Sequence, residues 1–266
     1  MTWIAAKRFV SGYVAMFSDV QVTWGNGAHR ENCLRKVYAM APNIACGFSG
    51  SVEVGFNLLA DMRFFAEQKL KRKQMLLPRQ FAFDWYRRGR NIFSDLPEPQ
   101  KKLGCSLILS GYSPVETAGA NTSLPRTDII IMNSANGFTP KITNNWKIVS
   151  IGSGSAKKRY VRFLESLNEP KNSASIENSY GQPGRAGENM AFMASIMLKD
   201  NIEPGISPCL HFTLVDAFGV KSYPLNFTSL YGEKKIKHEM PKVAETYSDF
   251  KTIEKNIVGM SSEAIG

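Results

Sequence analysis

The sequence predicts an α+β domain in which two antiparallel sheets pack face to face and helices cover their outer sides. Two observations support this fold class. Segments with strand patterns and segments with helical spacing follow one another as strands, two helices, strands, two helices and strands. The chain has 266 residues, of which 43% are hydrophobic, so it can bury one large core.

The first 50 residues carry the patterns of β-strands. Residues 2–10 are rich in β-compatible side chains, "SG" at 11–12 predicts a turn, and residues 13–17 are apolar. Residues 18–23 alternate between polar and apolar side chains, which predicts a half-buried strand. Residues 24–32 have the composition of a loop.

A second pair of strands is expected at residues 34–40 and 44–48, on either side of "APN". After "SGS" the spacing of apolar residues becomes helical, which predicts a helix over residues 52–70. Pro78 opens a second helical stretch over residues 79–93, and "SDLPEPQ" ends it.

The rest of the chain continues this order of elements. Two further helices are expected, one directly after "GSGS" and one over residues 188–199. The polar segments 113–126 and 171–187 are expected loops. The last 40 residues are more charged, and they predict only a short helix near residues 247–257. Strand patterns return at residues 105–112, 127–134, 146–151, 210–216 and 220–225.

The composition also indicates which partners to expect. The net charge is +10, and short basic clusters could attract an acidic partner. No nucleic-acid-binding motif accompanies them, so we expect solvated helix faces or subunit contacts and no nucleic-acid partner. No apolar run approaches the roughly 20 residues of a membrane helix, and no secretory signal follows Lys7 and Arg8. We therefore expect a cytoplasmic location and no membrane partner.

The cysteines and histidines predict neither a metal site nor a serine-type triad. The four cysteines are widely spaced and form no C-x-x-C pair, which indicates reduced thiols and no structural zinc. None of the three histidines has the context of a nucleophile elbow. The segment "GSGSAKK" departs from the phosphate-loop pattern. We therefore expect neither a metal nor a cofactor.

The opening "MTWIAAKRF" places a threonine directly after the first methionine. A threonine hydroxyl is a weak nucleophile, but at a chain terminus its own α-amine can act as general base. The reference pKa of an α-amine is about 7.7–8.0, and a nearby lysine would lower it by like-charge repulsion. A carboxylate would hold that lysine, and a backbone N–H at a glycine turn would receive the oxyanion.

Residues of these kinds follow one another in the order Thr2, Asp19, Lys36 and Gly50. Each lies at or just beyond a predicted strand, where the four could converge. Taken singly, each has an ordinary structural explanation: Lys36 would usually be a surface residue, and Gly50 would usually mark a strand-to-helix turn. Their order and context together favour a catalytic set.

The segments that hold these residues, "TWIAAKRFVSGYVAMFSDVQVT" and "RKVYAMAPNIACGFSGS", resemble the opening of proteasome β subunits. They are also similar to the peptidase subunit of the bacterial two-component ATP-dependent protease, above all in "SDVQVTWGN". The resemblance spans roughly residues 2–225 and is strong in the first 70 residues. The chain looks like a bacterial proteasome homologue of the betaproteobacterial type.

This resemblance implies the four-layer αββα sandwich of N-terminal-nucleophile (Ntn) hydrolases, and it gives each residue of the set a role. Thr2 would be the nucleophile once Met1 is removed. Lys36 would be the cation that lowers the pKa of the Thr2 amine, and Asp19 would be its partner. Gly50 would donate its N–H to the oxyanion.

A later segment, "IGSGSA", is similar to a family motif whose serine supports the threonine amine, and Ser153 matches that serine. The family's further Asp-x-x-Ser pair has no clean equivalent here. The segment "DNIEPGISP" offers Asp200 or Glu203, together with Ser207, at a different spacing. Which of these three residues supports the amine stays open.

The resemblance implies a threonine endopeptidase that cleaves polypeptides and assembles with copies of itself into a ring. An ATPase unfoldase is a further partner by analogy alone. The domain is expected at residues 2–225, with no propeptide before it and a C-terminal extension at 226–266. By the same analogy, the substrate pocket is expected near Gln21 and residues 51–54. Two alternatives stay open: a small-molecule Ntn amidase, and an inactive protein that uses the same fold for assembly or binding.

Overall fold

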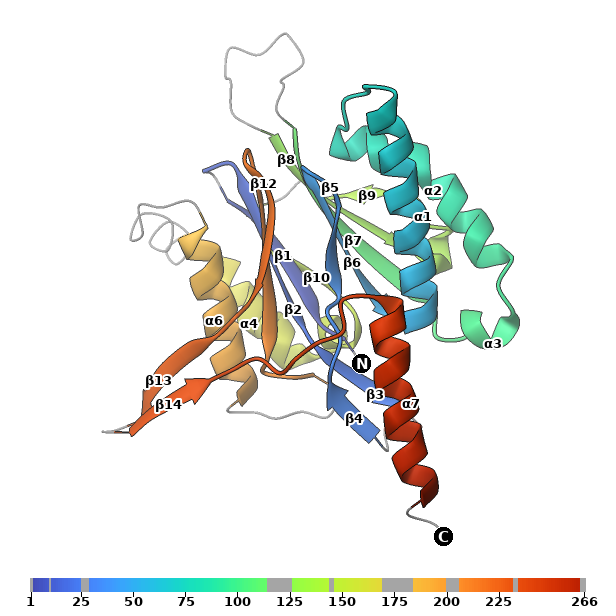
Figure 1. Cartoon of the computed structure of the whole chain (residues 1–266). Coiled ribbons are helices and arrows are strands. Elements are labelled where there is room, and N and C mark those ends of the chain that lie inside the picture. The colour runs from blue at the N-terminus through green and yellow to red at the C-terminus, as the bar shows by residue number, and fades with distance from the viewer. Residues whose placement is uncertain are drawn as a thin grey trace.

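The computed structural model describes residues 2–9, 11–24, 29–113, 126–143, 146–168, 184–199, 206–231 and 234–263. In these ranges the chain forms two five-stranded sheets, two two-stranded sheets and helices that pack against them (Figure 1). The strand pairs within the sheets are antiparallel. The prediction of an α+β fold with antiparallel sheets is confirmed.

The first five-stranded sheet joins segments that are far apart in the sequence, in the order β10-β1-β2-β11-β12. Every residue of β1, β2 and β11 is buried, because one face of these strands meets the second sheet and the other meets helices. The strands of this sheet are β1 (Ile4–Phe9), β2 (Tyr13–Asp19), β10 (Val149–Ile151), β11 (Leu210–Asp216) and β12 (Gly219–Pro224).

The second five-stranded sheet is a meander in the order β5-β6-β7-β8-β9, so neighbours in the sheet are also neighbours in the sequence. Its central strands β6 and β7 are mostly buried, and β6 ends on an exposed glycine at the start of the first long helix. The strands are β5 (Val37–Ala41), β6 (Ile44–Gly50), β7 (Cys105–Ser113), β8 (Arg126–Asn133) and β9 (Lys141–Ile142).

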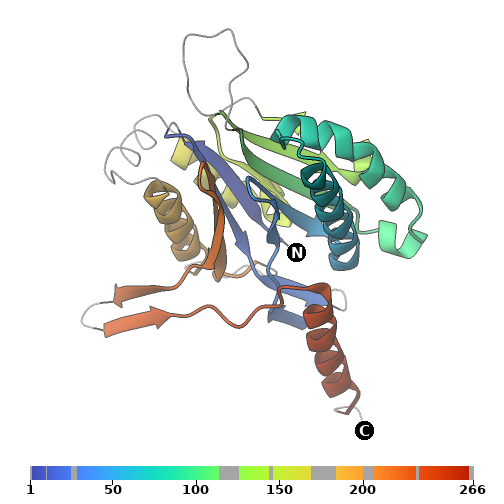
Figure 2. The same cartoon turned by 45° about the horizontal axis from the view of Figure 1, so that its top comes forward.

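The two sheets face each other across a cluster of buried apolar side chains. Ile4 and Val14 of the first sheet and Ile108 and Ile129 of the second belong to this cluster. Two further clusters lie under the helices on the outer faces of the sheets. Figures 1 and 2 show the same order of layers, with helices on both outer sides of the paired sheets.

The helices on the two sides come from different parts of the chain. α1 (Val52–Lys71) and α2 (Pro78–Ser94) cover the second sheet, and α4 (Lys158–Asn168) and α6 (Arg185–Lys199) cover the first. Three short helices, α3, η2 and η3, connect larger elements. Their bounds are Glu98–Lys101, Ser134–Asn136 and Ser153–Ala156.

Several expected boundaries are wrong. The expected loop at 24–32 contains a strand, β4 (His29–Asn32), that pairs with β3 (Gln21–Trp24). β4 has no buried residue, so it lacks the alternation that marks a half-buried strand. β10 begins at Val149 and not at residue 146, because the preceding residues do not join β1.

The C-terminal segment holds more structure than its composition predicts. β13 (Phe227–Tyr231) and β14 (Lys234–His238) form a hairpin that extends away from the sheets (Figure 2). The final helix, α7 (Tyr247–Glu263), is longer than the short helix expected there. No helix within the described ranges is long and apolar enough to span a bilayer.

Candidate active site

Thr2 lies just before β1 and is held at both ends of its backbone by the short helix η3. Its nitrogen donates to Ser153 Oγ at 3.1 Å. Its carbonyl oxygen accepts from Ser153 Oγ and from the Gly154 N–H, both at 3.3 Å. The nitrogen is a peptide nitrogen in the full chain, and it would become the α-amine if Met1 were removed. The structure thus brings Ser153 to Thr2, as the resemblance implies.

The bend that carries Ser153 requires a glycine at Gly152. Its φ is +88°, and a Cβ atom there would lie 2.2 Å from the Thr2 carbonyl oxygen. Only glycine adopts such a conformation at little cost and allows this close approach. The glycine-rich segment therefore shapes the binding of the Thr2 backbone.

Asp19 ends β2 and connects the N-terminal strand to the lysine. The Asp19 side chain is fully buried, and its Oδ1 accepts from the Trp3 N–H at 2.7 Å. Its Oδ2 accepts from the Gln21 N–H at 3.1 Å, and both oxygens lie 3.0 Å from Lys36 Nζ. Because Trp3 follows Thr2 directly, this carboxylate fixes the position of the N-terminal segment relative to Lys36.

Lys36 precedes β5 and is only 2% exposed. Besides the two Asp19 oxygens, its Nζ donates to the Gln21 carbonyl oxygen at 2.6 Å. These three acceptors match the three N–H donors of an ammonium group. Burial lowers the pKa of Lys36, and the neighbouring Asp19 carboxylate acts in the opposite direction. The surroundings therefore complement an oriented, charged lysine.

Gly50 ends β6 where the chain turns into α1. Its φ is +104°, and a Cβ atom would lie 2.3 Å from the Gly104 carbonyl oxygen. The next residue, Ser51, caps α1: its Oγ accepts from the Val54 N–H at 3.4 Å. The structural explanation of Gly50 as a strand-to-helix turn is thus correct, and it is compatible with a functional role for the same backbone.

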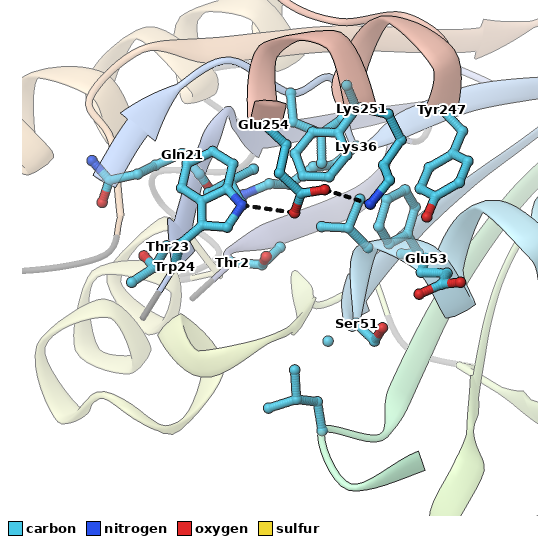
Figure 3. A pocket seen from close by; sticks show the side chains of 17 residues that line it. Thr2, Gln21, Thr23, Trp24, Lys36, Ser51, Glu53, Tyr247, Lys251 and Glu254 are labelled. Atoms are coloured by element: carbon cyan, nitrogen blue, oxygen red, sulfur yellow. Dashed lines mark hydrogen bonds and ion pairs between the residues drawn. The ribbon is translucent and has the colours of Figure 1, made fainter. Parts of the chain in front are cut away.

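Thr2, Lys36 and Gly50 line one pocket with a volume of about 240 Å³ (Figure 3). Asp19 is fully buried and does not line it. Most of the residues expected by analogy do line it, namely Gln21 and positions 51–53, while Val54 is buried and does not. Thr2, Lys36 and Gly50 therefore share one cavity, and Asp19 supports Lys36 and the Trp3 N–H from behind it through hydrogen bonds.

Of the three residues offered for the further supporting pair, only Ser207 lies within the described part of the chain. Asp200 and Glu203 lie outside the described residues. Ser207 is fully buried, and its Oγ accepts from the Cys209 N–H at 3.0 Å. Within the described part of the chain, the hydrogen bonds of Thr2 lead to the η3 segment and not to Ser207.

Two contributions to the site have no signal in the local sequence. The Gln21 carbonyl oxygen is the third acceptor for Lys36, and a backbone oxygen leaves no pattern of residue types. The C-terminal helix α7 also lines the pocket. Only its aromatic and charged composition could have indicated a contact with the domain, and composition does not indicate where.

A scan against protein-family models finds no match for this chain, and a search of the curated proteins likewise finds none.

Proposed function

We propose that this chain is a threonine-type endopeptidase of the proteasome family, and that its nucleophile is Thr2 Oγ after removal of Met1. One observation carries the proposal: Thr2 and Lys36 share a pocket, while Asp19 binds both Lys36 and the Trp3 N–H. We further propose that the two packed sheets with their outer helices are the αββα sandwich of Ntn hydrolases.

The proposed reaction proceeds through an acyl-enzyme. Thr2 Oγ attacks the carbonyl carbon of a peptide bond, and its proton passes to the Thr2 α-amine. The oxyanion of the tetrahedral intermediate accepts the Gly50 N–H. The amine returns the proton to the leaving nitrogen as the C–N bond breaks, which leaves an ester on Thr2. Water, deprotonated by the same amine, then hydrolyses this ester and releases the acid.

The neighbouring groups act on the α-amine and not on the substrate. Lys36 lowers the pKa of the amine by its positive charge, so that more of the amine is free base at neutral pH. Since the three donors of Lys36 are matched by Asp19 and the Gln21 carbonyl, it acts by charge and transfers no proton. Ser153 Oγ holds the nitrogen in position.

We also propose that the protein forms a ring of identical subunits that cleaves polypeptides delivered by an ATPase unfoldase. The β13–β14 hairpin supports self-association, because it extends away from the sheets (Figures 1 and 2). An isolated two-stranded hairpin is at best marginally stable in water, and a partner surface would stabilise it. Negative-stain images and the mass of the purified particle test this; a monomer at micromolar concentration would contradict it.

The nucleophile is tested by the intact mass of the purified protein and by turnover of fluorogenic peptides. We expect a mass that lacks Met1, and labelling of Thr2 by an epoxyketone or β-lactone. Thr2→Val keeps the shape of the side chain but removes the hydroxyl, so it should abolish cleavage, whereas Thr2→Ser should retain part of it. Thr139→Val, in an exposed turn, is the matched control and should be fully active.

Two outcomes would overturn the proposal. If Met1 is intact in the assembled protein, no α-amine exists at Thr2. If peptide cleavage survives in Thr2→Val, another group is the nucleophile. Cleavage of small amides but not of peptides would favour the Ntn amidase, and no turnover together with assembly would favour the inactive protein.

A further inference from the structure

The C-terminal helix α7 forms one wall of the pocket that Thr2 lines. Four of its residues, Tyr247, Phe250, Lys251 and Glu254, line the pocket. Figure 3 shows Glu254 and Lys251 extending from this helix and meeting in an ion pair. A segment from the far end of the sequence thus takes part in the candidate active site.

This wall is part of the folded domain. The Ala244 backbone, just before α7, bonds to Cys33 and Arg35, with N–O distances of 2.7 and 3.2 Å. Phe250 is 3% exposed and stacks on Trp24 with ring centroids 5.8 Å apart. Trp24 Nε1 also donates to Glu254 Oε1 at 3.1 Å. The position of the Glu254 carboxylate is therefore set by packing and by a hydrogen bond.

The charged groups of the pocket leave an excess of negative charge. Lys36 is balanced by Asp19, which lies directly behind it. Glu254 and Lys251 pair at 2.5 Å. Glu53, at the start of α1, is a second carboxylate in the same pocket.

The pKa of Lys251 reflects both carboxylates. The hydrogen bond to Glu254 raises the pKa of Lys251, and the charge of Glu53 adds to the effect. Two carboxylates thus act on one ammonium group, which leaves one negative charge uncompensated.

The remaining walls of the pocket are largely apolar. Leu34, Phe48 and Val52 line it together with the rings of Trp24 and Phe250. Arginine and lysine side chains have apolar stems that pack on such surfaces while their charged ends stay solvated. A stem against these walls would bring its cationic end to the carboxylates that line the same pocket.

We infer that the pocket binds a basic side chain, arginine or lysine, of the residue whose carbonyl Thr2 attacks, and that Glu254 of α7 selects it together with Glu53. This inference rests on the proposed function and adds the substrate class to that proposal. It gives the C-terminal helix a role in specificity.

The test uses two fluorogenic peptides that differ only at this residue, one with arginine and one with its uncharged isostere citrulline. The full-length assembled protein should cleave the arginine peptide with a kcat/KM at least threefold higher. Glu254→Gln keeps an acceptor for Trp24 Nε1 but removes the charge. The ratio of kcat/KM for the arginine peptide to kcat/KM for the citrulline peptide should therefore fall by about two- to fivefold. Lys251→Gln leaves both carboxylates without their ammonium, so the ratio should rise by a similar factor.

Labelling of Thr2 by a small β-lactone reports whether the nucleophile itself is intact. Labelling should still occur in wild type and in both variants, because the substitutions remove neither the Thr2 hydroxyl nor its amine. If Glu254→Gln fails to fold, Lys251→Gln tests the inference by itself, through the expected rise of its arginine-to-citrulline ratio. A ratio that neither variant changes overturns the pocket assignment and leaves the peptidase standing. Absence of both cleavage and labelling in the wild type overturns the proposed function and this inference with it.

Discussion

Lys36 Nζ lies 3.0 Å from both carboxylate oxygens of Asp19, and neither side chain is more than 2% exposed. A buried ion pair is weak evidence for stability, because its desolvation cost often equals its attraction. Asp19 also binds the Trp3 N–H, next to Thr2. The pair therefore connects the N-terminal strand to a fixed cation, which favours a role in the site over a purely structural one.

Removing Lys36 should damage both folding and reactivity. Lys36→Met keeps an apolar stem but leaves the Asp19 carboxylate buried without a counter-charge, which costs about 3–5 kcal/mol of unfolding free energy. Peptide cleavage should be lost at neutral pH. Urea denaturation and peptide turnover measure the two effects. Lys69→Met breaks a more exposed pair with Asp84 and should cost less than about 1 kcal/mol. Equal losses in the two variants would contradict the buried-pair argument.

Ser153→Ala should lower the reactivity of Thr2 without unfolding the domain. The variant removes the acceptor of the Thr2 nitrogen and one donor to the Thr2 carbonyl. We expect the kcat for peptides to fall by about tenfold or more, which corresponds to the roughly 1.4 kcal/mol of one hydrogen bond. Ser155→Ala is the control, because Ser155 Oγ bonds to Gly152 and not to Thr2. A Ser153→Ala enzyme as fast as Ser155→Ala would show that this serine does not position the nucleophile.

Gly50→Ala should be among the most damaging substitutions in the turn before α1. The new Cβ would lie 2.3 Å from the Gly104 carbonyl oxygen, at a φ of +104°, so the backbone must shift. We expect a loss of roughly 1–3 kcal/mol of stability from the strain, together with loss of cleavage. Gly137→Ala is the matched control, because Gly137 also has a positive φ, of +62°. A Cβ there would meet only the flexible Arg90 side chain, at 3.3 Å. It should keep full activity. Normal activity of Gly50→Ala would exclude this backbone as the oxyanion donor.

His211 should make the domain less stable in mild acid. Burial lowers the pKa of His211 to about 4, and the charge of Arg35 adds to the effect. In the unfolded chain the pKa is about 6.5. Between these values the unfolded state binds more protons, so stability is full above pH 6.5 and falls as the pH falls towards 4. The loss at pH 5 should be about 2 kcal/mol.

Urea denaturation at pH 7 and pH 5 measures this loss. His211→Asn keeps a polar partner for Ser222 but does not titrate, so it should lose less stability over the same interval. If both proteins respond equally to pH, His211 is not the group responsible.

Local patterns predicted the long elements well. α1 is expected over residues 52–70 and runs from Val52 to Lys71, because five buried apolar residues anchor it to the sheet. β11 was expected at residues 210–216 and has these bounds. The exposed β4 was missed, since it does not bury the alternating face that marks a strand in the sequence. The β13–β14 hairpin, which forms a two-stranded sheet of its own, was also missed.

The sequence by itself determined the order of a threonine, an aspartate, a lysine and a turn glycine, because residue type and backbone freedom are local properties. Only the tertiary structure decided which atoms meet. Ser153 reaches Thr2 across 151 positions because β10 pairs with β1. Lys36 binds Asp19 and the Gln21 carbonyl because the end of β2 and the starts of β3 and β5 lie at one place. The helix α7 became a wall of the pocket through packing on Trp24, and the periodicity of a single segment contains no information about such a contact.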